Sequence, residues 1–432
     1  MVLKIKIFDI FSDIALRHYG YFAAHPMPTR QSMSDSTVAT KPLSTALILL
    51  MAIATGLAVA SNYYAQPLLH TIAKELGLSM ESAGTVVITA QLSYGAGLLL
   101  LVPLGDLFEQ RRLIVTMTVL SALGLLLSAF APSLTWLLIG TAMTGLFSVS
   151  AQVLVPMAAS LTDPQSRGRV VGTLMSGLLL GILLARTVAG ALSSAGDWRT
   201  IYLVAAALML VSAIALFCAL PNHHQSAGLS YPKLLKSVFT LFVEEPVLRL
   251  RALLGLLTFS LFALFWTPLA FLLAVPPYSY SDAVIGLFGL AGAVGAVAAN
   301  WAGRMADRGK GQQATTAGLL VLLACWLPMA FAGHSLVALL IGVLALDFAV
   351  QLVHVSNQNA VFKVRPAARN RLNAGYITCY FIGGALGSLV GAQTYPAYGW
   401  DGIVVVGAVV ATLALAVWAY SLQRESRLQP VG

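Results

Sequence analysis

One long apolar run, residues 335–361, carries polar side chains at helical spacing. They fall at positions i, i+4, i+7 and i+11, on one face of a helix: Asp347, Gln351, His354 and Gln358. If this helix spans a membrane from Ser335, a rise of about 1.5 Å per residue puts Asp347 near the bilayer midplane. An ionisable group at that depth is costly and usually faces a cavity or a partner. The run therefore predicts a buried polar site.

Two interpretations of this polar face are open. In the functional one, Asp347 and His354 form a proton-coupling site, since a histidine pKa of about 6.5 lets modest shifts change its charge. Hydrogen bonds to a substrate would then come from the neighbouring amides, Gln351, Asn357 and Gln358. In the other, the polar residues hold neighbouring helices together. We assign the functional role to Asp347 and leave both interpretations open for His354.

A second buried charge, Arg186, lies about two-thirds along the apolar run 169–194. Small residues recur around it every four positions and permit close helix packing: Gly177, Gly181, Ala185 and Ala189. Arg186 could bind an anionic substrate or pair with Asp347. The alternative is that its long side chain reaches the outer membrane interface.

Further polar residues within apolar runs are candidates for the lining of a substrate cavity: Asn62, Tyr63, Gln66, Gln91, Tyr94 and Gln152. Tyr63 could equally belong to an interfacial aromatic belt. We find no nucleophile–base pair, no zinc-type Cys/His spacing and no phosphate-binding Gly-Lys-Ser/Thr loop, so we expect neither an enzyme nor a cofactor or metal. Without an ATP-binding motif, a proton gradient is the expected energy source.

The elements that must position these residues are long apolar helices. The chain is 58% apolar and only 9% charged, against roughly a quarter charged in soluble domains. Blocks of about 18 or more apolar residues match a hydrocarbon core of roughly 30 Å. We predict an all-α membrane protein with twelve helices, near 43–67, 83–105, 113–131, 134–160, 169–194, 199–220, 250–275, 282–303, 314–332, 335–361, 372–395 and 401–421.

The basic residues predict the orientation. They cluster in alternate short connections, whereas the other connections carry only Lys74 and Arg199. The positive-inside rule then places both termini in the cytoplasm, and the net charge of +9 needs no nucleic-acid partner. The expected cytoplasmic cations are Lys41, Arg111, Arg112, Arg167, Arg169, Lys233, Lys236, Arg249, Arg251, Arg304, Arg308, Lys310, Lys363, Arg365, Arg369, Arg371, Arg424 and Arg427.

The longest internal connection divides the helices into two sets. We expect six-helix bundles over 43–220 and 250–421, a central cytoplasmic loop over 221–249, and a cytoplasmic tail over 422–432. Residues 1–42 form an N-terminal extension, either an amphipathic surface segment or sequence upstream of a later start at Met27 or Met33.

The two halves repeat each other at an offset of 201–202 residues. Gln66-Pro67-Leu68 matches Thr267-Pro268-Leu269, and Gly181 matches Gly383. Residues 102–106 match 303–307, and 163–169 match 365–371. With six helices per half, the repeats are parallel in the membrane.

These repeated segments resemble the major facilitator superfamily over about residues 43–421. The segment Pro103-Leu104-Gly105-Asp106 followed by Arg111-Arg112 is similar to the family's signature loop, and residues 303–308 are its second copy. The resemblance implies a conformational latch formed by Asp106, Arg111, Arg112, Asp307 and Arg308; the alternative is a plain topology anchor.

Two further runs, 62–68 and 354–358 with 369–373, resemble the bacterial drug:proton antiporter-like branch. Ala185-Arg186 stands where drug antiporters carry Gly-Pro, a departure from that pattern. The resemblance implies proton-coupled efflux of a small organic molecule across the bacterial inner membrane by a monomer. Uptake of a small, anionic metabolite and a non-transporting membrane sensor are the alternatives.

Overall fold

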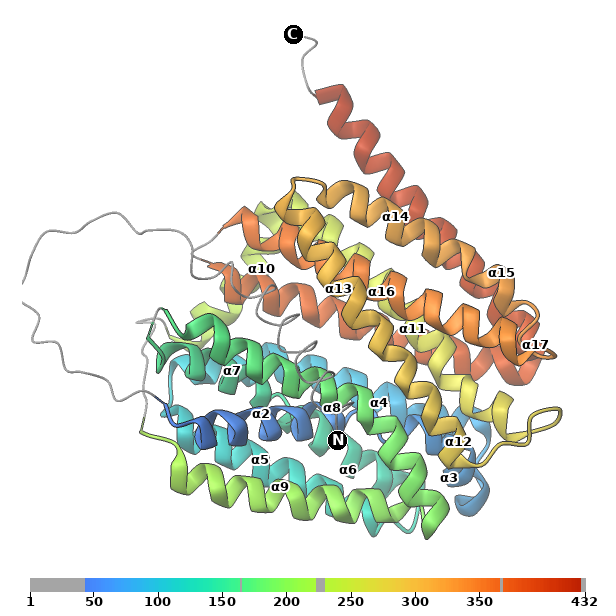
Figure 1. Ribbon diagram of the computed structural model, residues 1–432, viewed down its shortest axis with the longest axis horizontal. Helices are drawn as coiled ribbons and strands as arrows, with labels where there is room; N and C mark the ends of the chain where they lie inside the picture. The colour runs from blue at the N-terminus through green and yellow to red at the C-terminus, as the bar shows by residue number, and fades with distance from the viewer. Residues whose placement is uncertain (1–42, 164, 223–229, 366–367, 429–432) are drawn as a thin grey trace, which may run out of the picture.

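The computed structural model describes residues 43–163, 165–222, 230–365 and 368–428, and every regular element in these ranges is helical. The N-terminal extension that was predicted over 1–42 lies outside the described residues. The helices run side by side along the long axis of the molecule (Figure 1).

The first half contains α2 (Thr45–Ala60), η2 (Gln66–Leu68), α3 (Leu69–Leu76), α4 (Met80–Leu100), η3 (Val102–Asp106), α5 (Gln110–Ala129), α6 (Leu134–Phe147), α7 (Ser150–Ser160), α8 (Arg167–Ala195) and α9 (Arg199–Ala219). After α10 (Tyr231–Glu244), the second half contains α11 (Pro246–Ala274), α12 (Asp282–Leu287), η4 (Phe288–Ala291), α13 (Gly292–Asp307), α14 (Gly311–Ala324), α15 (Trp326–Met329), α16 (Leu336–Val364) and α17 (Arg369–Leu428).

Ten helical segments of the described chain are long and apolar enough to cross a membrane. The last of them, α17, contains two spans, because Gly399 has non-helical backbone angles (φ 62°, ψ −158°). The 16-residue α2 is a further, shorter apolar helix. With α2 and with α17 counted as two, the described residues contain the twelve predicted spans, and the prediction of an all-helical membrane fold is confirmed.

Several predicted spans are interrupted, such as 134–160 (α6 and α7) and 314–332 (α14 and α15), and two of the interruptions concern the interior of the molecule. The first predicted span is helical only to Ala60; Ser61 ends α2, and the chain turns before continuing as η2 and α3. Pro67 has no backbone N–H, so it is compatible with the start of a new helical segment and not with an unbroken helix. The span predicted over 282–303 is likewise divided into α12, η4 and α13. Both breaks lie next to the polar site described below.

The outer surface is apolar. Large side chains such as Val211, Ile214 and Val337 are more than 60% exposed. Monomeric soluble proteins rarely expose continuous apolar surface of this extent. Such side chains are stable where hydrocarbon replaces water, as around a membrane-spanning bundle.

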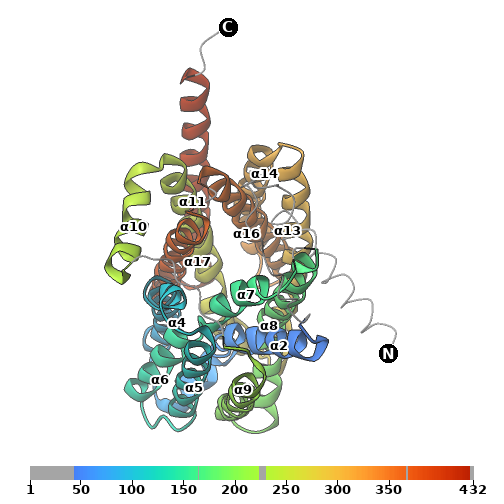
Figure 2. The same ribbon diagram turned by 90° about the vertical axis from the view of Figure 1, so that its left-hand side faces the viewer.

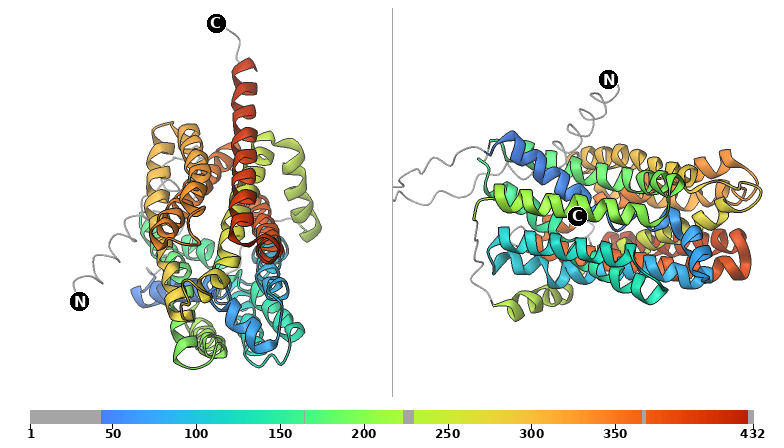
Figure 3. Two further views of the ribbon diagram at one scale, coloured as in Figure 1. Left: turned by 90° about the vertical axis from the view of Figure 1, so that its right-hand side faces the viewer. Right: turned by 90° about the horizontal axis from the view of Figure 1, so that it is seen from below.

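The helices form two groups. In the first, α2 packs along α8, and α5 packs against α6 and α9; in the second, α11 packs along α17, and α13 and α14 pack against α16. Figure 2 shows the first group below and the second above, and Figure 3 shows them from the opposite end and from below. The groups meet where α4 packs on α17 and α8 on α12.

Close backbone approach holds α2 to α8. A Cβ atom on Gly181 would lie 2.3 Å from the carbonyl oxygen of Gly56, and one on Gly56 would lie 2.6 Å from that of Gly177. Only glycine fits at such contacts. The predicted small-residue stripe of this helix therefore serves packing, and it fixes the helix that carries Arg186 against α2.

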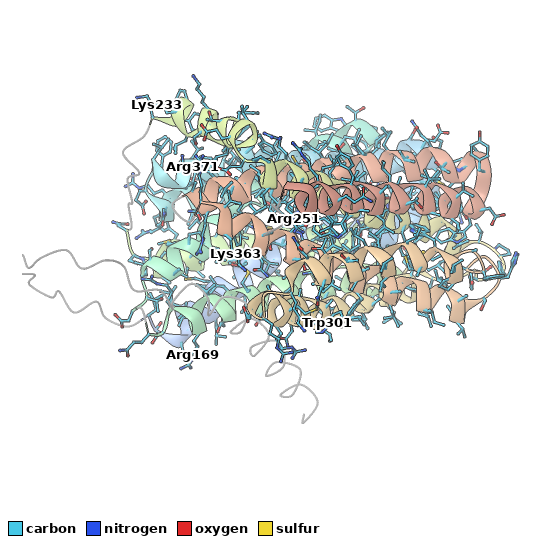
Figure 4. The ribbon with its side chains drawn as sticks, turned by 90° about the horizontal axis from the view of Figure 1, so that it is seen from above. Arg169, Lys233, Arg251, Trp301, Lys363 and Arg371 are labelled. Atoms are coloured by element: carbon cyan, nitrogen blue, oxygen red, sulfur yellow. The ribbon has the colours of Figure 1, made fainter. Side chains whose placement is uncertain are left out.

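The ends of the molecule differ in charge. We call the end that contains the N-termini of α5, α8 and α17 the basic end, and the other the distal end. Figure 4 shows Arg169, Lys233, Lys363 and Arg371 toward the basic end. The central connection lies there too and contains a helix, α10, whose Tyr231 hydroxyl donates a hydrogen bond to the Leu100 carbonyl (2.8 Å).

Arg251 does not lie in a connection, although we counted it among the loop cations. It lies inside α11 with 7% of its surface exposed. Its Nη1 donates to Thr315 Oγ1 (2.8 Å) and Asn357 Oδ1 (3.1 Å), and its guanidinium lies over the Trp418 ring. Arg251 thus joins α11, α14, α16 and α17 within the second group.

Candidate functional site

A cluster of polar and aromatic side chains connects the two helix groups in the interior. We call Gln66, Arg186, Trp266 and Asp347 the central cluster. Arg186 is 2% exposed and Asp347 is 5% exposed. Arg186 is positioned by α8 of the first group, and Asp347 by α16 of the second. The two buried charges predicted from the sequence therefore lie on opposite halves.

Arg186 is held by a hydrogen bond and by aromatic rings. Its Nε donates to Gln66 Oε1 at 2.6 Å. Its guanidinium carbon lies 4.2 Å from the centre of the Trp266 ring and 4.9 Å from that of Tyr63. Cation–π contacts of this kind partly replace the hydration that burial removes. The break between α2 and η2 is what brings Tyr63 and Gln66 to Arg186.

Asp347 is linked to Arg186 through Trp266. The indole Nε1 of Trp266 donates to Asp347 Oδ1 at 3.3 Å, while the indole ring lies against the guanidinium. Among the described residues, no ion pair within 4.0 Å joins Arg186 to Asp347 directly. Each of the two charges has a side-chain partner of its own, Gln66 for Arg186 and Trp266 for Asp347.

The central cluster has unused donors. Within the described residues, Arg186 Nη2 and Gln66 Nε2 are buried without a hydrogen-bond partner. A buried donor without an acceptor costs roughly 1–3 kcal/mol, and more when it is charged. Both donors lie on the two side chains that the Arg186–Gln66 hydrogen bond joins, so an anionic or carbonyl oxygen at this place would meet an unused donor. They are the strongest local indication of a ligand.

A cavity of about 540 Å³ lies at the basic end between the two groups. We call it the basic-end cavity; it includes Gln152 of α7, Met175 of α8 and Ile377 of α17. Its rim reaches the exposed Asn370, and the charged residues among its described lining side chains are Arg167, Arg369 and Arg371. The volume suits a small organic molecule.

An aromatic series connects this cavity to the central cluster. Gln152, which lines the cavity, donates to the Tyr94 hydroxyl at 3.4 Å. From Tyr94, ring contacts continue through Phe381, Phe259 and Phe262 to Trp266, with centroid distances of 4.5, 5.5, 5.3 and 5.9 Å. The sequence did not single out Phe259, Phe262 or Trp266, because aromatic residues in an apolar run give no pattern of their own.

Of the remaining candidate residues, some lie near the aromatic series and others contact neighbouring helices. Gln91 is 1% exposed, and its amide nitrogen and oxygen have no hydrogen-bond partner in the described residues. Asn62 donates to Ser148 Oγ (2.9 Å), joining the turn after α2 to the end of α6. Gln351 packs against Gly295 of α13. Gln91 and Asn62 are buried and Gln351 is half-buried; Gln91 lies near the aromatic series, because a Cβ atom on Gly384 would meet both Phe259 and Gln91.

The C-terminal half of α16 contacts α17 and α11. His354 Nδ1 is 3.0 Å from the Tyr376 hydroxyl, and its ring lies 4.4 Å from that of Tyr380. Gln358 donates to Asn373 Oδ1 (3.2 Å), and Asn357 accepts from Arg251. These contacts are within the second group, as the packing interpretation expects; the functional interpretation remains a prediction.

The signature-loop residues make local contacts. Arg111 donates to the Leu220 carbonyl (3.3 Å) and to Asn222 Oδ1 (3.2 Å), at the end of α9. Arg112 lies 3.6 Å from Glu109, whose carboxylate caps the N-terminus of α5. Asp307 and Arg308 are exposed at the end of α13. The side chain of Asp106 lies outside the described residues, so the latch remains a prediction.

At the distal end the two groups are in contact. Asp282, at the start of α12, accepts hydrogen bonds from Thr71 Oγ1 (2.8 Å) and Ser193 Oγ (2.6 Å) of the first group. A Cβ atom on Gly190 would lie 2.1 Å from the Asp282 carbonyl oxygen. We call this α8–α12 contact the distal closure. The chain is therefore hollow at one end and closed at the other.

We expect Asp282→Ala to favour an open distal end. The substitution removes an acceptor for Thr71 and Ser193, and hydrogen bonds to a charged group contribute roughly 1.5–3 kcal/mol each. The open population should rise by about tenfold or more, since about 1.4 kcal/mol corresponds to a tenfold change. Spin labels at Ser133→Cys and His334→Cys, in a background without Cys218, Cys325 and Cys379, measure the distance across this end. An unchanged distance distribution would show that Asp282 does not hold the closure.

Within the described residues, no group of three His, Cys, Asp or Glu side chains could hold a metal ion. The arrangement is suited to binding a small molecule, since it offers a cavity, buried hydrogen-bond donors and two separated charges.

Comparison with known proteins identifies the class. The model of the Major Facilitator Superfamily matches residues 51–367, and the chain belongs to this family of membrane transporters. The fold and the family identify a multi-pass membrane transporter and not an enzyme, as predicted.

Individual relatives agree with this assignment. The chain is 58% identical over 389 residues to the uncharacterized transporter YgaY of Escherichia coli O157:H7, covering 89% of this chain and 99% of that protein. It is 25% identical to the inner membrane transport protein YnfM of Escherichia coli K12, covering 84% and 87%. Its fold resembles the inward-facing, occupied structure of a bacterial homolog of the human lysosomal transporter Spinster, with a TM-score of 0.75, 13% identity and coverage of 91% and 100%.

Proposed function

We propose that this protein is a proton-coupled secondary transporter that exports a small organic molecule across the bacterial inner membrane as a monomer. The observation that carries the proposal is the placement of Arg186 and Asp347 on opposite helix groups, in the interior and without a direct ion pair. Alternating access requires a site that both groups share, and here each group contributes one charge.

In the proposed cycle, the basic end faces the cytoplasm, in accordance with the positive-inside rule. A substrate enters the basic-end cavity and moves along the aromatic series toward the central cluster. Aromatic faces and the amides of Gln91 and Gln152 suit a molecule with both apolar and polar parts. Asp347 takes up a proton from the outer side and releases it to the cytoplasm as the groups rock.

Proton binding at Asp347 changes the balance within the cluster. An ionised Asp347 attracts the guanidinium of Arg186 and accepts from Trp266, whereas the neutral acid loses that attraction. The proton and a substrate that contacts Arg186 would thus act on one pair of charges, which couples the movement of one to that of the other. Antiport requires that the two exclude each other at this pair, whereas joint binding would move them in the same direction.

A specific observation also favours the uptake of an anionic metabolite. Among the described side chains, the charged residues that line the basic-end cavity are Arg167, Arg369 and Arg371, and Arg186 has an unused donor deeper inside. A basic cavity raises the local concentration of anions. Under this second candidate function, a proton at Asp347 and an anion at Arg186 would move inward together.

Flux in reconstituted vesicles separates the two candidates. Purified protein in proteoliposomes with a defined pH gradient should accelerate movement of at least one compound from a panel of cationic, neutral and anionic molecules, with a matching proton flux. Export predicts that substrate and proton move in opposite directions, and uptake predicts the same direction. The transporter proposal fails if no compound and no substrate-dependent proton flux exceeds that of protein-free vesicles.

A further inference from the structure

A second cavity lies at the basic end, outside the transport route described above. It has a volume of about 350 Å³ and lies between α10, the residues after α16 and the start of α17. We call it the α10 pocket. It is lined by Lys233, Lys236, Ser237, Thr240, Leu241, Glu244, Arg365, Ala368 and Arg371. Figure 4 shows Lys233 and Arg371 close to each other at this end.

The α10 pocket has a surplus of positive charge. Among its described lining residues, four side chains are cationic and Glu244 is the one carboxylate. Glu244 is occupied by Arg365, whose Nη1 lies 2.7 Å from its carboxylate and whose Nε pairs with Glu245 (2.5 Å). Two carboxylates therefore balance the charge of Arg365.

The other three cations, Lys233, Lys236 and Arg371, form no ion pair within the described residues. Like charges that are held around one cavity repel one another unless an anion is bound between them. The pocket is therefore best matched by a ligand with a negative charge of its own.

The outward side of α10 is apolar next to these cations. Phe239 is 60% exposed and Val243 is 78% exposed, while Leu234, Val238 and Leu241 are buried against the protein. Val247, just beyond the helix, is 40% exposed. A short helix with lysines and exposed apolar side chains is typical of a helix that lies in the membrane interface. A ligand at this place would meet charge and hydrocarbon together.

We propose that the α10 pocket binds the phosphate headgroup of an anionic phospholipid, with its acyl chains along Phe239 and Val243. Basic pockets at the membrane surface recognise such headgroups, and each lysine or arginine near the surface contributes about 1 kcal/mol. Free inorganic phosphate offers the same charge but would leave the apolar residues in water, which is why we assign the lipid.

The position of Arg371 connects the pocket to the transport route. Arg371 lines both the α10 pocket and the basic-end cavity, and Leu234 and Val238 of α10 also line that cavity. A bound headgroup would neutralise part of the positive charge at the cavity mouth. The site is nonetheless defined by binding alone and does not depend on the proposed function.

Native mass spectrometry of the full chain in detergent tests the assignment. The probes are dioleoyl phosphatidylglycerol and, as the neutral comparison, dioleoyl phosphatidylcholine. The wild-type protein should retain phosphatidylglycerol preferentially. The double variant Lys233→Gln/Lys236→Gln should bind it about tenfold or more weakly, because two cations at about 1 kcal/mol each are lost.

The matched control is Lys310→Gln/Lys363→Gln, which removes two exposed charges at the same end but outside the pocket. It should bind like the wild type, and both variants should melt like the wild type in lipid-free detergent. Equal weakening in the control would mean that only general surface charge attracts the lipid. Unchanged binding in the pocket variant, or full competition by millimolar inorganic phosphate, would also overturn the proposal.

Discussion

Asp347→Asn should abolish gradient-driven transport and leave the fold and substrate binding in place. Asparagine keeps the shape of the side chain and can still accept from Trp266 Nε1, but it cannot be ionised. If Asp347 carries the proton, a pH gradient across proteoliposomes should no longer drive net movement of substrate. We expect a loss of about a hundredfold or more, the range in which removal of an essential proton-transfer group falls.

The informative control is exchange without a gradient. Counterflow of labelled against unlabelled substrate needs only the movement of the loaded carrier, so it should persist in Asp347→Asn. Coupled transport at the wild-type rate would eliminate Asp347 as the proton site. Loss of both activities with a normal melting temperature would instead assign Asp347 to substrate binding. His354→Gln, measured in parallel, decides between the two interpretations of that histidine.

Gly190→Val should trap the distal end open. A Cβ atom at this position would lie 2.1 Å from the Asp282 carbonyl oxygen and 3.2 Å from the Cα atom of Gly286. Both are backbone atoms, so no side-chain rotation relieves the clash. The two helix groups would have to separate where α8 meets α12, and the carrier could not complete its cycle.

The expected result is transport reduced by about tenfold or more, because closure at this end would cost more than about 1.4 kcal/mol. Spin labels at Ser133→Cys and His334→Cys should report a longer distance across the distal end. Ala191→Val is the matched control, since the next residue of α8 is exposed and a larger side chain there meets no protein. If Gly190→Val is closed at the distal end and active, the α8–α12 contact accommodates the larger side chain by other shifts, and the prediction is wrong.

The architecture was largely predictable because it depends on local properties of the sequence, namely the length of each apolar block and the charge of each loop. Apolar block length and loop charge predicted twelve spans. The offset of 201–202 residues also related η2 to the Pro268 region of α11, and both lie in the first span of their half. What could not be predicted was where a span breaks. The turn after Ser61 depends on partners such as Ser148 and Arg186, which are distant in the sequence.

The candidate site was predictable only in its charged members. Arg186 and Asp347 stood out because ionisable residues are rare in apolar runs. Trp266, which links them, has no such signal, since tryptophan is ordinary in a membrane helix. Arg251 was misplaced for the opposite reason: at the start of an apolar run an arginine resembles a loop cation, and only the fold reveals Thr315 and Asn357 around it. Pairwise contacts of this kind leave no periodicity and no composition bias in the sequence.

The division of the two buried charges between the helix groups has an electrical consequence. With Asp347 ionised, the positive charge of Arg186 is balanced and the central cluster carries no net charge. With Asp347 protonated, one positive charge remains uncompensated, and a full passage through the membrane field would change its energy by about 2.3 kcal/mol per 100 mV. The proton-loaded carrier would therefore respond to membrane voltage, whereas the proton-free one would not. An anion bound at Arg186 would cancel that response, so currents recorded with and without substrate would reveal the charge of the cargo.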